Sequence, residues 1–195
     1  MTLLADERGG VVAKFLVLLV VLAVLAGGAL YLYGTNQQPL AFDGTHAATG
    51  DHERNPTTVA VTRGATISIA TVLRNVGRLP VTLEGLVEDP PGRDDPFVPI
   101  SLGLGDGTTP TPSATGFAPP ALDPSSGIGV VITYGVNPNL SCTRFTDEPG
   151  DARSLPPVDL RFSSYGVEST QAVPLDTGAP TVEGITRAHC EAVVP

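Results

Sequence analysis

The stretch "GATISIATVLRNVGRLPVTLEGLVE", Gly64 to Glu88, decides the fold class of this chain. Its first half alternates apolar and polar side chains with a period of two, which is typical of a half-buried strand. One face of that strand would carry Ile67, Ile69, Thr71 and Leu73. The second half alternates in the same way, with Leu79, Val81 and Leu83 on one face. The pattern predicts two neighbouring β-strands.

Between the two runs, Asn75-Val76-Gly77 is predicted to form a structural corner. An asparagine side chain can bond its own backbone, and glycine accepts a positive φ without steric cost. Pro80 lacks a backbone donor, so it fits the start of a strand or a sheet edge. We therefore expect Asn75 and Gly77 to turn the chain sharply between two sheets and to carry no binding chemistry.

Further alternating runs extend this pattern along the chain. A short strand is predicted at Thr57 to Thr62, and Val131 adds a second apolar face to the run Ile128 to Tyr134, as in a buried central strand. Val158 to Phe162 and Val167 to Val173 flank "SYG" as a hairpin, with Glu168 and Gln171 at solvated positions. About seven strands, with 19 Pro, 22 Gly and no Trp, predict an all-β antiparallel sandwich.

The order of these motifs resembles bacterial immunoglobulin-like modules, including adhesion-related domains of surface proteins. The strand, Asn-x-Gly corner, proline and second strand look like the crossing from strand B to strand C of such modules. The segment "FAPPALDPSSGIGVVITYG", Phe117 to Gly135, is similar to the lead into a later long strand. The hairpin resembles one in single-pass actinobacterial membrane proteins. Over Thr57 to Val173 the resemblance implies an immunoglobulin-like fold outside the cytoplasm, and no activity.

An apolar segment precedes the predicted strands. The run "VVAKFLVLLVVLAVLAGGALYLY", Val11 to Tyr33, has 23 residues and a single charge, Lys14. At about 1.5 Å per residue it is long enough for a hydrocarbon core of about 30 Å. Tyr31 and Tyr33 fit an interfacial aromatic belt, and Lys14 can extend back to the other interface. The sequence predicts one transmembrane helix over residues 11–33.

The basic residues set the predicted orientation of this helix. Arg8 and Lys14 precede or begin the run, and no further base occurs before Arg54, so the positive-inside rule places residues 1–10 in the cytoplasm. Everything after Tyr33 is then outside the cell membrane. A cleaved signal peptide is the alternative, since Gly27 and Ala29 are small residues at plausible cleavage positions.

The outer part divides into three predicted segments. Residues 34–56 lack an apolar period and are interpreted as a stalk, and residues 57–195 form the sandwich domain. Residues 88–127 form a Pro-rich loop with a short edge strand at Phe97 to Leu102. Acidic and histidine side chains in the stalk and loop lack the spacing of a metal site. They are His46, Asp51, His52 and Glu53 in the stalk, and Asp89, Asp94, Asp95 and Asp106 in the loop.

The chain has two cysteines, Cys142 and Cys190, both on the predicted outer side. Disulfides persist in oxidising compartments, so we predict that the two are bonded. The alternative is a metal pair or a thiol nucleophile formed by His189 and Cys190. Neighbouring residues of a strand point to opposite faces, which argues against their convergence on one ion or substrate.

The residue inventory disfavours catalysis. The outer part has 18 acidic and nine basic residues, a balance that repels nucleic acid. There are three His, no Trp and a single Met, and no G-x-S-x-G motif occurs, so no catalytic residue, cofactor or metal is predicted. We expect a membrane-anchored extracytoplasmic domain that contacts another envelope protein as a binding or scaffolding protein. The alternatives are a metal- or small-ligand-binding sensor that uses the acidic loop, and a structural cell-surface element.

Overall fold

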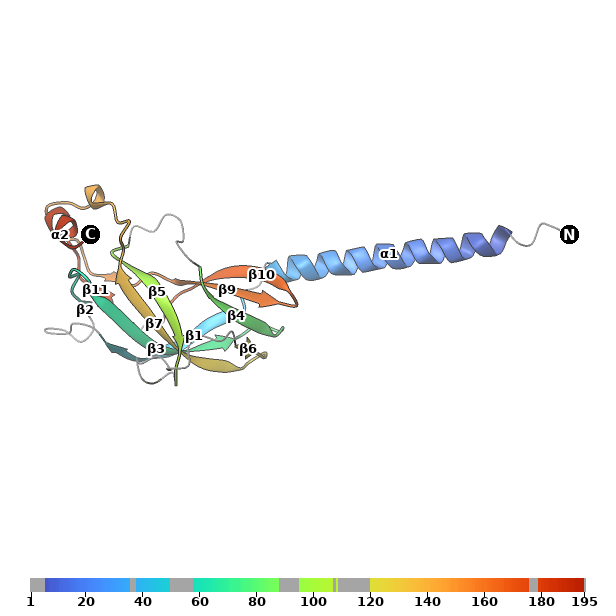
Figure 1. The fold of residues 1–195 in the computed structure, drawn as a ribbon, viewed down its shortest axis with the longest axis horizontal. Helices are drawn as coiled ribbons and strands as arrows, with labels where there is room; N and C mark the ends of the chain where they lie inside the picture. Colours follow the sequence, from blue (N-terminus) through green and yellow to red (C-terminus); the bar gives the residue numbers. More distant parts are fainter. Residues whose placement is uncertain are drawn as a thin grey trace. The chain divides into compact units, whose positions relative to one another are not determined.

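The computed structural model describes residues 6–35, 38–49, 58–87, 95–106, 108, 120–175 and 179–194. The chain divides into two compact units, Met1–Gln37 and Gln38–Pro195. The first unit contains one helix, α1 (Asp6–Thr35), and the second contains eleven described strands with two short helical segments (Figure 1). The prediction of a mostly β chain is confirmed, with more strands than the seven expected.

Helix α1 covers the whole of the apolar run 11–33. Its side chains are described for residues 13–29, where the large apolar residues from Phe15 to Leu25 are 46–67% exposed. Lys14 is exposed, while the side chains of Tyr31 and Tyr33 lie outside the described positions. Among the residues that are described, no helix is both long enough and apolar enough to cross a membrane.

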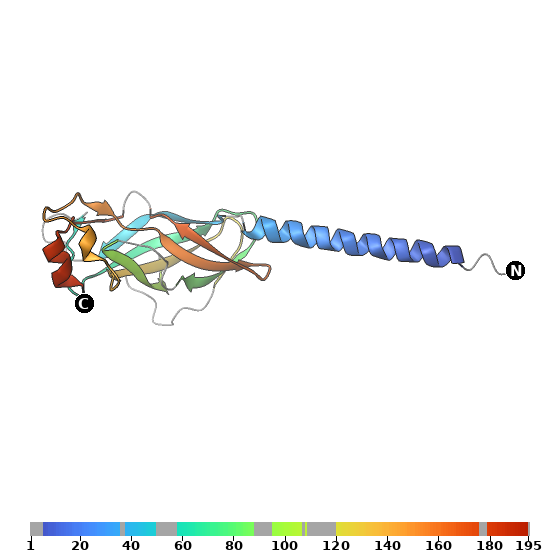
Figure 2. The same ribbon diagram turned by 90° about the horizontal axis from the view of Figure 1, so that it is seen from above.

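Two four-stranded antiparallel sheets form most of the second unit (Figures 1 and 2). The first has the order β1 (Leu40–Thr49), β3 (Thr66–Asn75), β7 (Gly127–Val136) and β5 (Phe97–Leu104). The second has the order β10 (Val167–Val173), β9 (Val158–Ser164), β4 (Val81–Leu86) and β6 (Ala121–Leu122). The predicted central strand is thus β7, and the predicted edge strand at residues 97–102 is part of β5.

A third, smaller sheet joins short segments from distant parts of the chain. It has the order β2 (Thr58–Val59), β11 (Thr181–Val182) and β8 (Arg153–Ser154), with β2 and β11 parallel. The helical segments η1 (Cys142–Arg144) and α2 (Arg187–Val193) complete the unit. Strands of two residues are too short to show a period, which is why the sequence predicted fewer strands.

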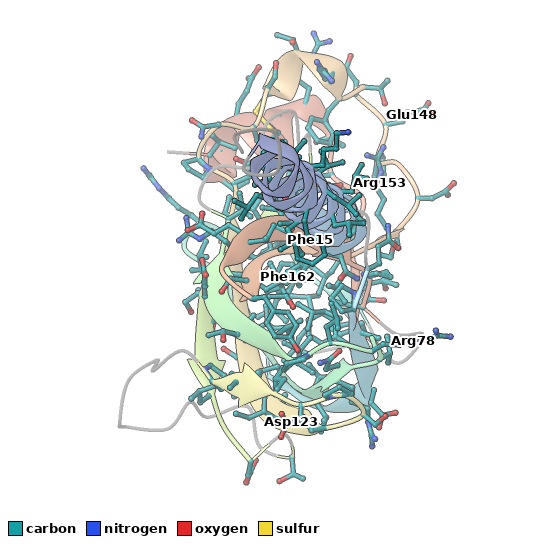
Figure 3. All side chains as sticks on the ribbon, turned by 90° about the vertical axis from the view of Figure 1, so that its right-hand side faces the viewer. Phe15, Arg78, Asp123, Glu148, Arg153 and Phe162 are labelled. Carbon is teal, nitrogen blue, oxygen red and sulfur yellow. A yellow bond between two sulfur atoms is a disulfide. The ribbon has the colours of Figure 1, made fainter. Side chains whose placement is uncertain are left out.

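One hydrophobic core lies between the two large sheets. The apolar faces predicted from the period of two point into it. Its fully buried members include Ile67, Ile69, Leu73, Ile132 and Tyr134 from the first sheet, and Leu83, Leu160 and Phe162 from the second. Phe162 is labelled inside the sandwich in Figure 3. The hairpin turn is as predicted, because Tyr165 and Gly166 both have positive φ (49° and 79°), the conformation that two-residue turns require.

The predicted stalk is wrong over Leu40–Thr49, which form strand β1. This strand pairs with β3 from Leu40 opposite Asn75 to Thr49 opposite Ser68, with register shifts between Phe42 and Ala47. The shifts, together with Gly44 at φ 72°, break the period of two and hide the strand in the sequence. Residues 50–56 of the predicted stalk lie outside the described residues.

Gln171 joins the two sheets along one side of the sandwich. Its amide oxygen accepts a hydrogen bond from Leu40 N at 3.0 Å, and its Nε2 donates to Leu40 O at 2.6 Å. A side chain thereby takes the place of a strand partner between β1 and β10. The alternation predicted a solvated position for Gln171, but its exposure is 8%. The polar side chain is buried because both of its amide atoms have partners.

The predicted corner connects β3 of the first sheet with β4 of the second. The Asn75 side chain accepts from Gly77 N at 2.9 Å and donates to Leu79 O at 2.8 Å and Leu122 O at 2.9 Å. The expectation of a positive φ at Gly77 is wrong, since Gly77 is not among the positive-φ residues. The glycine is needed for space, because a Cβ there would lie 2.7 Å from the Cβ of Pro39.

Replacement of Gly77 by valine is therefore expected to lower the stability of the domain. Moving Pro39 away from the added Cβ is a local overpacking, with a cost of about 1–3 kcal/mol. Thermal unfolding measures the effect, with Arg78→Val as the control because Arg78 is the next residue and is exposed. An unchanged melting temperature combined with loss of partner capture would identify the corner as a recognition site.

Candidate functional site

The sandwich has two structurally distinct ends. At the entry end, β1 begins, the corner connects β3 to β4, and the hairpin of β9 and β10 turns. At the other end, η1, α2 and the small sheet of β2, β8 and β11 form a group that we call the cap. Figures 1 and 2 both show α2 and β11 at one end of the strands and the hairpin tip at the other.

A disulfide between Cys142 and Cys190 holds the cap together, as predicted. It joins η1 to α2, with a Cα–Cα distance of 5.5 Å. Both cysteines of the chain are used, so neither is a free nucleophile or thiolate ligand. His189 and Cys190 lie on a helix, which corrects the strand placement assumed for them.

Hydrogen bonds fix α2 to the rest of the cap. Thr186 is the N-cap, and its Oγ1 accepts from His189 N at 3.1 Å. His189 Nε2 lies 2.6 Å from Val61 O, and a carbonyl only accepts, so Nε2 carries the proton in this bond. Arg187 Nε donates to Phe145 O at 3.2 Å, and its backbone N donates to Thr146 O at 2.8 Å. The helix therefore holds the segment that follows the first cysteine.

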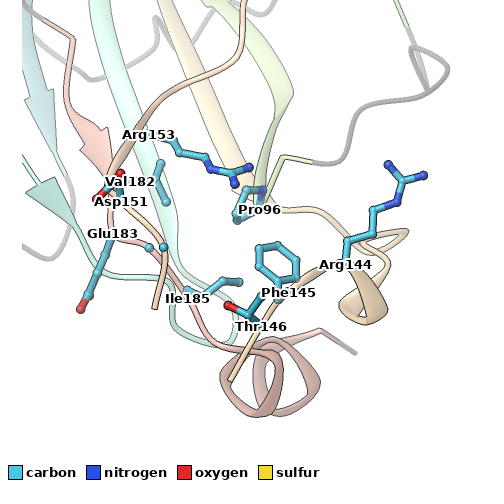
Figure 4. A pocket seen from close by; sticks show the side chains of 11 residues that line it. Pro96, Arg144, Phe145, Thr146, Asp151, Arg153, Val182, Glu183 and Ile185 are labelled. Atoms are coloured by element: carbon cyan, nitrogen blue, oxygen red, sulfur yellow. The ribbon is translucent and has the colours of Figure 1, made fainter. Parts of the chain in front are cut away.

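The cap encloses a pocket with a volume of about 120 Å³ (Figure 4). Its walls combine apolar side chains with charged ones. The lining residues are Pro96, Arg144, Phe145, Thr146, Gly150, Asp151, Arg153, Val182, Glu183, Gly184 and Ile185. In Figure 4 the Arg153 guanidinium extends toward Pro96, whereas the Glu183 carboxylate points away from the pocket. The pocket therefore offers an apolar floor beside one inward-directed cation.

A close approach of two backbone segments shapes the rim of this pocket. A Cβ at Gly184 would lie 1.8 Å from the carbonyl oxygen of Gly150, so only glycine fits at this position. The contact brings the segment after β11 against the segment before β8. The sequence alone did not reveal this pocket, because its residues come from four separate segments. Two sequence features relate to the pocket: the glycines at 150 and 184, and the pair of cysteines. The sequence predicted the disulfide and gave no sign of the contact between the glycines.

The acidic loop residues do not converge in the described structure. Asp95 and Asp106 lie at opposite ends of β5, where the Asp95 carbonyl accepts from Asn137 Nδ2 and the Asp106 carboxylate accepts from Thr108 N. Asp89 and Asp94 lie outside the described residues, as do Asp51, His52 and Glu53. Within the described ranges, no group of three His, Cys, Asp or Glu side chains could hold a metal ion.

Comparisons with known proteins do not assign this chain to a family, so its class is defined by the fold. No protein-family model matches the chain, and no curated protein matches it either. The class that the structure defines is a mostly β, disulfide-bonded domain built around two antiparallel sheets.

Proposed function

We propose that this chain is a membrane-anchored, extracytoplasmic, immunoglobulin-like binding protein that contacts another envelope protein through the cap pocket. The size of the pocket carries the proposal. Small-molecule sites usually have volumes of about 300–1,000 Å³. At about 120 Å³, the cap pocket has room for one side chain of a partner and is too small for most metabolites.

The chemistry of the pocket fits a protein contact. Phe145, Val182 and Ile185 provide an apolar surface, and Arg153 lies beside it. Aromatic and arginine side chains are enriched among the residues that dominate protein–protein binding energy. The disulfide and the hydrogen bonds of α2 hold the pocket before a partner arrives, which lowers the entropic cost of binding. The best-fitting ligand is an apolar side chain with a carboxylate near it.

The strand order supports an immunoglobulin-like fold. In the constant-type immunoglobulin fold, one sheet has the order A-B-E-D and the other contains C, F and G. When β1, β3, β4, β5, β7, β9 and β10 are named A to G in chain order, the sheet β1-β3-β7-β5 has the order A-B-E-D. The strands β10-β9-β4 then have the order G-F-C. Two features depart from that fold: β6 adds to β4, and the disulfide joins η1 to α2 instead of linking the two sheets.

Membrane anchoring rests on the sequence of the apolar run Val11 to Tyr33. Six of its 23 residues, at the two ends, lie outside the positions with described side chains. The helical backbone of α1 satisfies its own polar groups, as a membrane span requires. The disulfide favours an oxidising compartment for the second unit, in agreement with a cytoplasmic N-terminus. All nine bases of the outer part are Arg, which supports a GC-rich, actinobacterial source.

Charge reversal at the pocket tests the proposed binding role. In the full-length chain, Arg153→Glu is expected to reduce crosslinked partner capture from membranes by roughly tenfold, or about 1.4 kcal/mol. Arg63→Glu is the matched control, because Arg63 is also exposed and precedes β3 at the same end, but does not line the pocket. Both variants should keep the parent melting temperature.

Equal partner capture by the two variants would contradict the pocket as the contact surface. Metal analysis of the purified protein separates the proposal from its main alternative. A stoichiometric bound metal would favour a sensor, and capture that depends on Arg153 would favour a protein-binding domain.

A further inference from the structure

Large apolar side chains are exposed at the entry end of the sandwich. Among the described residues of Gln38–Pro195, the large hydrophobic side chains that are more than half exposed are Val76 (61%), Ile100 (53%) and Tyr165 (70%). Val76 belongs to the corner after β3, and Tyr165 is at the tip of the hairpin of β9 and β10. Contiguous exposed apolar surface marks contact sites, whereas single exposed apolar side chains are common, so the position of Val76 relative to Tyr165 matters.

Hydrogen bonds place the corner and the hairpin tip at the same end as the start of β1. Val76 N donates to Pro39 O at 2.7 Å, so the corner lies against the residue that precedes β1. Ser164 Oγ, next to Tyr165, donates to Pro80 O at 2.8 Å, at the end of the same corner. Ile100, in contrast, lies between residues paired with Thr133 and Tyr134 in the far half of β7.

An open recess of about 370 Å³, lined by both polar and apolar residues, lies beside the corner. Its walls include Leu40, Phe42, Val76, Val173 and Leu175. The recess lies where β1 and β10 meet, beside the hydrogen bonds between Gln171 and Leu40. Leu40 and Val173 are buried, so the half-buried Phe42 and Leu175 are the residues that extend the accessible apolar surface beyond Val76.

Few charged groups lie at this end. Arg74 Nε and Asp43 Oδ2 form an ion pair at 2.6 Å, and Arg78 and Asp123 are both exposed (Figure 3). With Asp106 at the end of β5 and Glu168 beside the hairpin turn, the described charged groups here sum to −2, whereas the whole chain carries −9.

The length of the chain limits what this surface can face. Only residues 36 and 37 separate the end of α1 at Thr35 from Gln38. The Cα atoms of Thr35 and Gln38 are therefore three residue steps apart, which is at most about 11 Å. We propose that the entry end rests on the outer surface of the bilayer, with Tyr165 and Val76 in the interfacial layer. The inference rests on the anchoring proposed above. Tyrosine prefers this layer because its ring is apolar and its hydroxyl remains hydrated.

Single tryptophans can report the position of each part, because the chain contains no Trp. The full-length variants are Tyr165→Trp at the entry end, Ile100→Trp in the far half of the sandwich, and Leu22→Trp within the apolar run. Each is reconstituted in phosphatidylethanolamine and phosphatidylglycerol vesicles that contain phosphatidylcholine with a nitroxide on the headgroup or in the middle of the acyl chain. Quenching of fluorescence then measures proximity to each depth.

The headgroup nitroxide is expected to quench Tyr165→Trp roughly threefold more strongly than Ile100→Trp, since tyrosine positions of this kind favour the interface. The acyl-chain nitroxide should quench Leu22→Trp. If Leu22→Trp is quenched but Tyr165→Trp behaves like Ile100→Trp, the anchor stands and the docking inference is wrong. If Leu22→Trp is not quenched by either nitroxide, the anchor itself fails. A blue shift of Tyr165→Trp without quenching would show a protein neighbour in place of lipid and would also overturn the inference.

Discussion

Asn75→Asp is expected to unfold the sandwich at temperatures at which the parent chain is folded. The Asn75 side chain is fully buried and makes three hydrogen bonds, two of them donated by Nδ2 to the carbonyls of Leu79 and Leu122. The substitution replaces this donor by an oxygen. One carboxylate oxygen would keep the bond from Gly77 N, but the oxygen in place of Nδ2 would face the two carbonyl oxygens with no proton to donate to either.

The expected loss is about 3–5 kcal/mol, a large fraction of the stability of a domain of this size. The effect should reach beyond the corner, because Asn75 Nδ2 also holds the end of β6 through Leu122 O. Denaturant unfolding of the parent and variant gives the difference in free energy. Asn139→Asp makes the same chemical change at an exposed site and should be nearly neutral. Similar losses in both variants would show that the side-chain bonds of Asn75 do not organise the corner.

Removal of the disulfide by Cys142→Ala and Cys190→Ala together is expected to cost a comparable amount. The bridge closes a loop with a sequence separation of 48, for which the chain-entropy model gives about 4 kcal/mol. Cys190 is also fully buried, so truncation leaves unfilled space next to the core. The melting temperature should fall, and the cap pocket should lose its partner because η1 and α2 are no longer joined.

A reducing agent provides the internal control for this prediction. It should lower the melting temperature of the parent protein to nearly that of the double variant and should leave the double variant unchanged. Equal stability of the parent and the double variant in the absence of reductant would mean that the bridge does not support the fold. Retained partner capture by a folded double variant would place the contact surface away from the cap.

The sequence by itself determined the strands that face the core. In β4, β9 and β10, and over most of β3, burial alternates along the strand, so the local sequence shows it with a period of two. The disulfide followed from a different local fact, the presence of two cysteines in a chain with a predicted oxidising environment. The corner at Asn75 was visible because a turn depends mainly on the residues within it.

Only the tertiary structure decided the features that depend on distant residues. Strand β1 was interpreted as a stalk because its register shifts remove the period, and its pairing with β3 supplies the missing hydrogen bonds. Gln171 is buried because Leu40, 131 residues away, satisfies its amide. Gly77 is required by the approach of Pro39, and Gly184 by that of Gly150. The cap pocket arises from such contacts. A contact between segments that are far apart in the sequence does not produce a periodic pattern in either segment, so the sequence alone does not predict it.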